Sequence, residues 1–360
     1  MSAYLDIRSL SLAMGTFRLD EITLGLDRGD YLVLLGPTGC GKTTLLRAVA
    51  GFHRVGRNRL ILDGRDLGVL PAHQRRVGYV AQTTDLFPHL SVAENVAFGL
   101  RYGGRDRRAA GETLERCLGL LGLGALRDRR VGGLSGGESR KVAIARSLAV
   151  GPAVLLLDEP LGMLDPNSRQ DVLETLLRVH NELGTTTIHV THERVEAWAA
   201  GSRCAVMGAG RLHQVGPVAE VFRRPVSRFV AEFLGGRNLY PARVEPSGEA
   251  VTAWGRVRLA ANAGGGRPGP AEGLLCLRPE AIHPADGPAA RVTGTAAAVR
   301  NFGSYAELCV ELPGGAPMIV HLPVRAAAAV RLGEEIGLGW TDEDVHLIPP
   351  EAAAEARGQP

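Results

Sequence analysis

Short apolar runs, each ending in glycine or charged residues, mark the first two thirds of the chain. The segments "YLDIRSLSLAM" and "FRLDEITLGLD" alternate apolar and polar positions, which predicts antiparallel strands within residues 1–30. Continuously apolar runs follow, and such runs are typical of strands buried on both faces. These runs are "YLVLLG" (31–36), "RVGYVAQ" (76–82), "AVLLLDEP" (153–160), "TTTIHVTHE" (185–193) and "CAVMGAGRLHQVG" (204–216). Helical segments separate them, so we expect an α/β domain over residues 1–235, with a mostly helical subdomain at about 88–150.

Beyond residue 236 the pattern changes to short alternating strands broken by glycine and proline. Examples are "AVTAWGRVRLA", "PMIVHLPV" and "IGLGWTDEDVHLI". Many short strands at close spacing predict a small all-β barrel or sandwich over residues 236–350. The last segment, "EAAAEARGQP" (351–360), is small and polar, and we expect a flexible tail.

Composition narrows the class of protein. The 41 basic and 38 acidic residues give a net charge of +3, which is no indication of nucleic acid as a main partner. No apolar run reaches the length of about eighteen residues that a membrane span needs. The start "MSAYLDIRSL" lacks the pattern of a signal peptide. The five cysteines form no C-x-x-C pair, so we expect reduced thiols and neither disulfides nor a zinc site.

The segment "GPTGCGKTT" fits the pattern G-x-x-x-x-G-K-[ST] between an apolar strand and a helix. In this setting backbone N–H groups hold the phosphates of a nucleotide. We expect Lys42 to reach the β- and γ-phosphates and the Thr43 hydroxyl to bind Mg²⁺. The predicted ATP-binding loop consists of Gly36, Pro37, Thr38, Gly39, Cys40, Gly41, Lys42, Thr43 and Thr44.

Two acids end the run "AVLLLDEP" and emerge at the carboxyl edge of the predicted sheet, where ligands bind in such sheets. We expect Asp158 to hold Mg²⁺ through water and Glu159 to polarise the water that attacks ATP. Two acids after a strand are common by themselves. In a chain that also has a phosphate-binding loop, they indicate Mg²⁺ binding and activation of water.

The segment "LSGGESRK" (134–141) places small residues before a helix, which is a second phosphate-binding helix start. With "GPTGCGKTT", "LLLDEP" and "VTHE" in this order, residues 1 to about 235 resemble the ATP-binding subunits of ABC transporters. The resemblance implies that this segment closes over ATP bound by a second copy of the chain, in a homodimer with two ATP molecules. The residues implied to bind ATP in trans are Leu134, Ser135, Gly136, Gly137 and Glu138.

The resemblance assigns further roles one residue at a time. Gln82 in "YVAQ" matches the loop glutamine that senses Mg²⁺ and the attacking water, and His192 matches the switch histidine that contacts the γ-phosphate. Asp165 in "LGMLD" matches an acid of the loop where two subunits touch. The adenine-stacking aromatic residue has no direct counterpart, so either Met14 or nearby Phe17 takes its place. Two smaller departures are Glu at the fifth position of "LSGGE", where Gln is common, and "THER" in place of "THD".

The last third resembles the OB-like accessory domain of bacterial importer ATPases. The resemblance rests on "GGRNLYPARV", "LLCLRPEAI" with Arg278, Pro279 and Glu280, and "GSYAELCVEL". It implies uptake rather than export. The domain either supports the dimer or binds a regulator or the cargo, with "AVRNFGSY" (298–305) as a candidate lining. OB folds also bind nucleic acid, but aromatic residues interleaved with Lys or Arg are missing here.

The resulting hypothesis is an ATP-hydrolysing subunit of a bacterial ABC importer, peripheral on the cytoplasmic face of the inner membrane. Its partners would be integral permease subunits and an extracytoplasmic solute-binding protein, and "LFPHLSVAENVAFGL" (86–100) resembles the permease-docking surface. The expected cargo is an oxyanion such as molybdate, tungstate or sulfate, with polyamines, ferric iron and sugars as alternatives. A soluble ABC ATPase of DNA repair or the ribosome is a second alternative, but the chain lacks sustained heptads and a second ATPase module.

Cys40 raises a separate hypothesis, because it lies inside the phosphate-binding loop. Neighbouring N–H groups and Lys42 can lower the pKa of a thiol and make it oxidisable, which would allow redox control. The alternative is a small residue that the loop merely tolerates.

Overall fold

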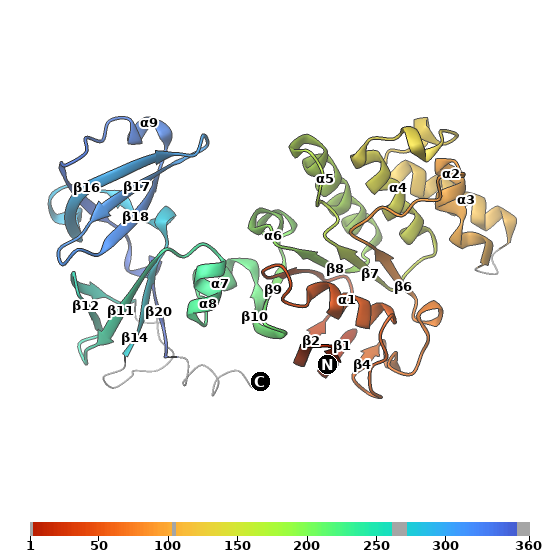
Figure 1. Cartoon of the computed structure of the whole chain (residues 1–360), viewed down its shortest axis with the longest axis horizontal. Helices are drawn as coiled ribbons and strands as arrows, with labels where there is room; N and C mark the ends of the chain where they lie inside the picture. Colours follow the sequence, from red (N-terminus) through yellow and green to blue (C-terminus); the bar gives the residue numbers. More distant parts are fainter. Residues whose placement is uncertain (1–2, 103–105, 261–271, 351–360) are drawn as a thin grey trace. The chain divides into compact units, whose positions relative to one another are not determined.

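The computed structural model describes residues 3–102, 106–260 and 272–350 (Figure 1). The chain divides into two compact units after Val218. The sequence pattern changes later, near residue 236, and the short helices α7 (Val218–Arg223) and α8 (Arg228–Phe233) occupy the stretch between. The tail predicted at 351–360 lies outside the described residues. Within the described ranges, no helix is long and apolar enough to cross a membrane.

A six-stranded sheet in the order β10-β9-β3-β8-β7-β6 forms the centre of the first unit. Its strands are β3 (Tyr31–Leu35), β6 (Val77–Val80), β7 (Val154–Asp158), β8 (Thr186–Thr191), β9 (Arg203–Gly208) and β10 (Arg211–Pro217). All neighbours pair in parallel except β9 and β10. The prediction of one strand over 204–216 was wrong, because the chain turns back at Ala209 and Gly210, both with positive φ. Glycine adopts such a φ without strain, which favours a turn there.

Both faces of this sheet are covered, which explains why its strands are continuously apolar. Along β7, Leu156 belongs to the hydrophobic core that includes residues of α1 (Lys42–Ala50). Its neighbour Leu157 belongs to a second core, which includes residues of α4 (Gly136–Ala149) and α5 (Pro166–Leu183). The α/β prediction for this part of the chain is confirmed.

A smaller antiparallel sheet, in the order β2-β1-β4-β5, shares the core that contains α1. Its strands are β1 (Leu5–Met14), β2 (Phe17–Leu26), β4 (Leu60–Leu62) and β5 (Arg65–Asp66). Met14 and Phe17 face each other as the last pair of β1 and β2. The turn between these strands therefore holds both candidates for stacking on adenine.

Helices α2 (Val92–Ala97), α3 (Arg107–Leu120) and α4 pack together in the region between β6 and β7. Figure 1 shows them as a group beside the sheet, with α5 running next to α4. The short helix α6 (Arg194–Ala200) follows β8. Each of β3, β6, β7 and β8 thus leads at its carboxyl end into a loop, and three of those loops continue into α1, α5 or α6.

The second unit is all-β apart from its short helices, as predicted. One antiparallel sheet contains β11 (Asn238–Val244), β12 (Glu249–Thr252), β13 (Gly255–Arg258), β14 (Glu272–Leu277) and β20 (Val345–Ile348). The other contains β15 (His283–Pro284), β16 (Val292–Asn301), β17 (Ala306–Glu311), β18 (Pro317–Leu322) and β19 (Glu335–Gly339), with α9 (Val324–Ala327) after β18. Both sheets enclose a core in which Trp254 meets Tyr240 and Trp340 edge to face, at 5.3 and 6.0 Å between ring centroids.

Candidate nucleotide-binding and hydrolysis site

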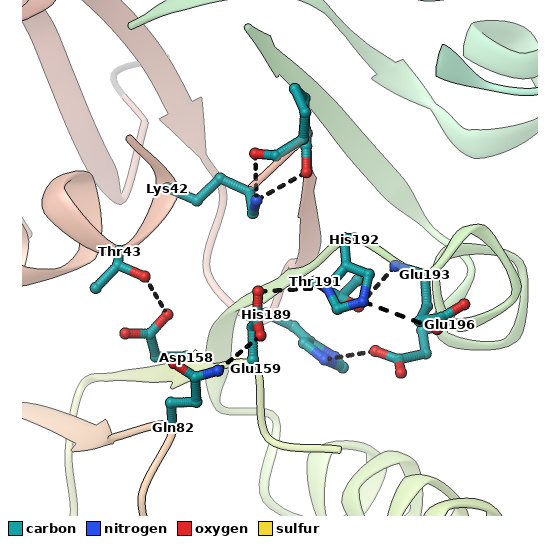
Figure 2. Close-up of polar contacts among 12 residues, drawn as sticks. Lys42, Thr43, Gln82, Asp158, Glu159, His189, Thr191, His192, Glu193 and Glu196 are labelled. Carbon is teal, nitrogen blue, oxygen red and sulfur yellow. Dashed lines mark hydrogen bonds and ion pairs between the residues drawn. The ribbon is translucent and has the colours of Figure 1, made fainter. Parts of the chain in front are cut away.

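The loops that follow β3, β6, β7 and β8 place the predicted catalytic residues in one region of the first unit (Figure 2). A cavity of about 580 Å³ opens there. It is lined by Met14, Phe17, Thr38, Gly39, Gly41, Lys42, Thr43, Thr44, Gln82 and Glu159. The cavity therefore brings together residues from the phosphate-binding loop, the β1–β2 turn and two sheet-edge loops. Both candidates for stacking on adenine lie in its wall.

The phosphate-binding loop needs glycine at two positions for different reasons. A Cβ on Gly36 would lie 2.3 Å from the carbonyl oxygen of Met207 on β9, which no other residue could tolerate without movement. Gly41 has φ of 108° and is the N-cap of α1, a conformation that side chains rarely adopt. The loop therefore curls closely against β9 and presents the positive end of α1 to the cavity.

Lys42 lies inside this curl and is 4% exposed. Its Nζ donates to the carbonyl oxygens of Gly36 at 2.7 Å and Pro37 at 3.0 Å, as Figure 2 shows. An ammonium group has three donors, so one remains for an anion in the cavity. The loop backbone thus orients the lysine for a phosphate oxygen.

Asp158 is almost completely buried, and hydroxyl groups donate to both of its carboxylate oxygens. Thr43 donates to Oδ1 and Tyr79 donates to Oδ2, each at 2.8 Å. Burial, with a contribution from Asp158, raises the pKa of Tyr79 to about 12, so the phenol keeps its proton at neutral pH. Sequence reasoning missed Tyr79, because its only sequence signal is its position three residues before Gln82.

Thr43 and Asp158 together fit a magnesium site. Mg²⁺ in nucleotide enzymes takes one or two protein oxygens, completes its shell with phosphate oxygens and water, and seldom uses a cage of protein ligands. No group of three His, Cys, Asp or Glu residues in the described part of the chain could hold a metal by itself. One hydroxyl and one buried carboxylate in contact provide the donor set that a nucleotide-bound Mg²⁺ requires.

Glu159 is held between two side chains from other loops. Gln82 Nε2 donates to Oε2 at 3.0 Å, and His192 Nδ1 lies 3.3 Å from Oε1 (Figure 2). Glu159 also has φ of 45°, which is unusual for a residue with a side chain. Such strain is found mainly at functional sites, where the surroundings maintain it. The backbone turn after β7 thus directs this carboxylate toward Gln82 and His192.

A buried polar cluster supports the loop that carries His192. His189, which lies on β8 three residues before His192, is fully buried, and its Nδ1 lies 2.9 Å from the Tyr31 hydroxyl. Its Nε2 lies 3.3 Å from Oε2 of Glu196 on α6, which makes this an electrostatic contact rather than a well-aligned hydrogen bond. Burial opposes ionisation of Glu196, but His189 and Thr191 together lower its pKa. These contacts join β8 to α6 on either side of His192.

The "LSGGE" segment lies outside the cavity wall. Ser135 is exposed and is the N-cap of α4, where its Oγ accepts from the Glu138 backbone N–H at 3.2 Å. In return Glu138 Oε2 accepts from the Ser135 backbone N–H at 2.7 Å, which completes a capping box. The hydrogen bonds from Ser135 lower the pKa of Glu138. Reciprocal hydrogen bonds therefore hold the helix start, and its serine is exposed to solvent in this chain.

Asp165 is the N-cap of the next helix, but without a reciprocal capping box. Its carboxylate accepts from the backbone N–H groups of Asn167 and Ser168 at 3.1 and 3.0 Å, at the start of α5. Hydrogen bonds from Ser168 lower its pKa. Nearby Met163 is 88% exposed and has φ of 62°. The loop that is predicted to touch a second copy thus presents an apolar side chain on a fixed backbone.

The environment of Cys40 argues against redox control. The thiol is 5% exposed, and burial raises its pKa despite the opposing effect of Lys42. A thiol with a raised pKa forms less thiolate at neutral pH, and the thiolate is the reactive form.

In the second unit, residues 298–305 form the end of β16 and the turn to β17. Phe302 is half exposed there and stacks on Tyr305, with ring centroids 5.2 Å apart. Tyr305 in turn contacts His321 of β18 at 4.5 Å. A binding role for this aromatic group stays a prediction.

Comparison with known proteins decides the family. Residues 19–162 match the family described as ABC transporter, and residues 275–348 match the TOBE domain. The spermidine/putrescine import ATP-binding protein PotA of Frankia alni is 38% identical over 354 residues, covering 93% of this chain and 76% of that protein. This chain belongs to the ATP-binding subunits of bacterial ABC importers. It is therefore an ATPase coupled to transport.

Two further importer subunits show how widely the named cargo varies. The Fe(3+) ions import ATP-binding protein FbpC of Streptomyces coelicolor is 41% identical over 322 residues, covering 89% of this chain and 88% of that protein. The sulfate/thiosulfate import ATP-binding protein CysA of Bordetella parapertussis is 44% identical over 239 residues, covering 65% of this chain and 68% of that protein. The ABC importer ATPase prediction is confirmed, and the TOBE match agrees with the predicted OB-like domain.

A solved structure with the same fold is the ATP-binding cassette MJ0796, a dimer in a post-hydrolysis state bound to ADP and Pi. It is 25% identical with a TM-score of 0.52, covering 59% of this chain and 98% of that chain. Similarity at this level supports the cassette fold of the importer subunit described here.

We predict that Cys40 resists alkylation in the folded chain. At about pH 7.5 the raised pKa leaves little of the thiol as thiolate. Each rise of the pKa by one unit lowers the thiolate fraction about tenfold, and the thiolate is the reactive form. Iodoacetamide labelling followed by mass spectrometry should show Cys40 reacting more slowly in the folded chain than in urea, because the thiol is both buried and less ionised. The half-buried Cys309 provides an internal comparison. Labelling of folded Cys40 as fast as the unfolded thiol would revive the redox hypothesis.

Proposed function

We propose that two copies of this chain bind two ATP molecules between them in a head-to-tail homodimer. One observation carries the proposal: the cavity gathers Lys42, Thr43, Gln82 and Glu159, whereas the exposed Ser135 of the same chain is not part of its wall. A phosphate-binding helix start that does not serve its own cavity is suited to serve that of another copy. Met163 and Asp165 lie on the loop proposed to touch that copy.

Within each cavity, different residues of the chain bind the phosphates, accept the proton and hold Mg²⁺. The triphosphate lies at the N-terminus of α1, where the loop N–H groups and Lys42 offset its charge. Glu159 takes a proton from water as the water oxygen attacks the γ-phosphorus and the bond to the β-phosphate oxygen breaks. Gln82 and His192 restrict the Glu159 carboxylate to one orientation, which is the main requirement for a general base. Bound through Thr43 and Asp158, Mg²⁺ would neutralise phosphate charge.

The dimer would dock on integral permease subunits at the cytoplasmic face of the bacterial inner membrane, as a peripheral component. A solute-binding protein would deliver the cargo from outside. The expectation of an oxyanion is supported by the sulfate/thiosulfate relative. Relatives that match nearly the whole chain carry the names of polyamine and ferric-iron importers. We therefore broaden the proposed cargo to a small ion, with these three classes as candidates.

Replacing Glu159 with Gln should reduce kcat by about 10² or more, because the amide cannot accept the proton from water. ATP binding should persist, since Lys42 and the loop are intact, and an ATP-bound dimer should accumulate. Phosphate-release assays and size-exclusion chromatography with ATP measure the two effects.

The exposed Glu182 on α5 provides the control, and Glu182→Gln should leave turnover unchanged. Normal turnover in Glu159→Gln would mean that another group accepts the proton.

Replacing Ser135 with Arg should block hydrolysis while ATP still binds to the isolated chain. The larger cationic side chain would prevent the helix start from closing over the partner's nucleotide, but it lies outside the chain's own cavity wall. Equilibrium binding of a fluorescent ATP analogue and steady-state hydrolysis separate the two steps. Ser247→Arg, at an exposed turn of the second unit, is the matched control. If Ser135→Arg abolished binding instead, the segment would act within its own chain.

The transport claim predicts specific partners. Affinity capture of the tagged chain from detergent-solubilised membranes of its source, followed by mass spectrometry, should recover a multi-span permease and a solute-binding protein. Calorimetry of that binding protein with sulfate, molybdate, spermidine and Fe³⁺ should show binding in the micromolar range or tighter for one class only. Recovery of soluble or ribosomal proteins alone would contradict the transport role and leave the ATPase chemistry standing.

A further inference from the structure

Helix α4, which begins at the "LSGGE" segment, also holds the loop that follows β6. Ser147 donates to the carbonyl oxygen of Tyr79 at 3.2 Å, near the end of β6. Farther along the loop, Arg146 donates to the Asp85 carbonyl at 3.0 Å, and its guanidinium lies 5.3 Å from the ring centroid of Phe87. The loop carrying Gln82 is thus fastened to the helix that begins after Ser135, from the end of β6 as far as Phe87.

Arg140 makes the central contact of this set. One guanidinium nitrogen donates to the Ala81 carbonyl at 2.6 Å and another to the Gln82 carbonyl at 2.5 Å. The planar fork of arginine matches two neighbouring acceptors, which the single ammonium of lysine cannot bridge in the same way. Arg140 therefore fixes the backbone at the residue whose side chain contacts Glu159.

Arg140 is a charged side chain that is buried, so its position carries an unfavourable free energy that the contacts with the loop must offset. The side chain is 3% exposed, and its Nε is one of the few buried side-chain atoms in the described residues without a hydrogen-bond partner. Burying a charged group is unfavourable unless its hydrogen bonds compensate. The two bonds to the loop are thus needed to keep the arginine in place, and helix and loop are expected to move together.

The contacts form a continuous path through one chain. Ser135 caps α4, Arg140 on α4 holds the Gln82 backbone, and Gln82 Nε2 donates to Glu159 at 3.0 Å. The first turns of α4 and three direct contacts separate the exposed serine from the proposed base. Coupling between sites requires such an element that both sites can bias.

We propose that Arg140 is a positioning residue that couples nucleotide contact at Ser135 to the placement of Glu159 in the same chain. The inference rests on the proposed dimer. ATP held by one copy contacts Ser135 of the other, and α4 of that other copy then aligns Gln82 and Glu159 over its own ATP. Each ATP thereby activates the opposite cavity, and hydrolysis rises cooperatively with ATP concentration.

Arg140→Lys and Arg140→Gln in the full-length chain test this coupling. Lysine keeps the charge, and glutamine keeps a neutral donor, but neither reproduces the fork. Both variants should reduce kcat about tenfold or more, because misplacing a reacting group by about 1 Å can cost up to about a hundredfold. The Hill coefficient for ATP should fall toward 1, while ATP affinity changes by less than about twofold, since the cavity wall does not include Arg140.

Lys141→Gln is the matched control on the same helix. Lys141 forms an ion pair with Asp171 on α5 at 2.6 Å rather than with the loop that carries Gln82, so its loss should leave kcat and the Hill coefficient unchanged. Thermal unfolding of all variants shows whether an effect comes from lost stability. If Arg140→Lys loses stability but keeps its cooperativity, the arginine is only structural and the proposal is wrong.

A double-mutant cycle with Gln82→Ala gives the decisive readout. If Arg140 acts through Gln82, Arg140→Lys should reduce kcat little further in the Gln82→Ala background. Independent, multiplicative losses would overturn the proposal. The proposal would also be wrong if Ser135→Arg blocks hydrolysis but the native chain hydrolyses ATP with a Hill coefficient of 1. Failure of Ser135→Arg to block hydrolysis would instead contradict the dimer itself.

Discussion

The site depends on the parallel register of four neighbouring strands. Leu35 at the end of β3 lies opposite Thr191 of β8, Val190 lies opposite Asp158 of β7, and Leu157 lies opposite Val80 of β6. The strands therefore end at nearly the same level, and the loops after them meet. A shift of β7 by one residue would exchange the side chains packed into the two cores and move Asp158 away from Thr43 and Tyr79. The packing of the strands thus places the proposed catalytic groups.

Around that edge, polar groups hold one another in fixed positions. Two hydroxyl groups donate to Asp158, and Gln82 and His192 flank Glu159. A preorganised carboxylate is useful because it needs little rearrangement when charge moves in the reaction. The strained backbone at Glu159 fits this picture, since the surrounding contacts maintain a conformation that the residue would not adopt alone.

The sequence predicted most of the α/β unit and the local parts of the site. Continuous apolar runs indicated the buried strands, and the glycine pattern indicated the phosphate-binding loop because its geometry is formed by consecutive residues. Tyr79 and Arg140 were missed because their contacts join residues 79 and 58 positions apart, and no local pattern encodes such pairs. The strand at 204–216 was predicted wrongly because its apolar positions continue through a turn.

The residue proposed to contact adenine is a second feature that the sequence alone did not decide. Met14 and Phe17 are paired across one turn and both line the cavity, so strand register places two candidates where a motif requires one. The Phe17 ring also lies where a side chain on Gly41 would have to go, with Cζ 2.4 Å from the ideal Cβ position. The ring and the glycine therefore depend on each other. Sequence position alone could not reveal this, because Phe17 begins β2 and Gly41 lies 24 positions later, in the loop before α1.

The capping box at Ser135 has a consequence for the direction of hydrogen bonding. The Oγ atom accepts from the Glu138 N–H, which uses a lone pair and leaves the hydroxyl hydrogen to donate. An exposed donor at the positive end of a helix attracts acceptors and anions rather than cations. Glutamate and glutamine serve equally well as the reciprocal acceptor, since only a side-chain oxygen is needed. Glu138 thus keeps its charge beside the serine hydroxyl, and in the proposed dimer the partner's phosphate would approach that hydroxyl past a negative neighbour.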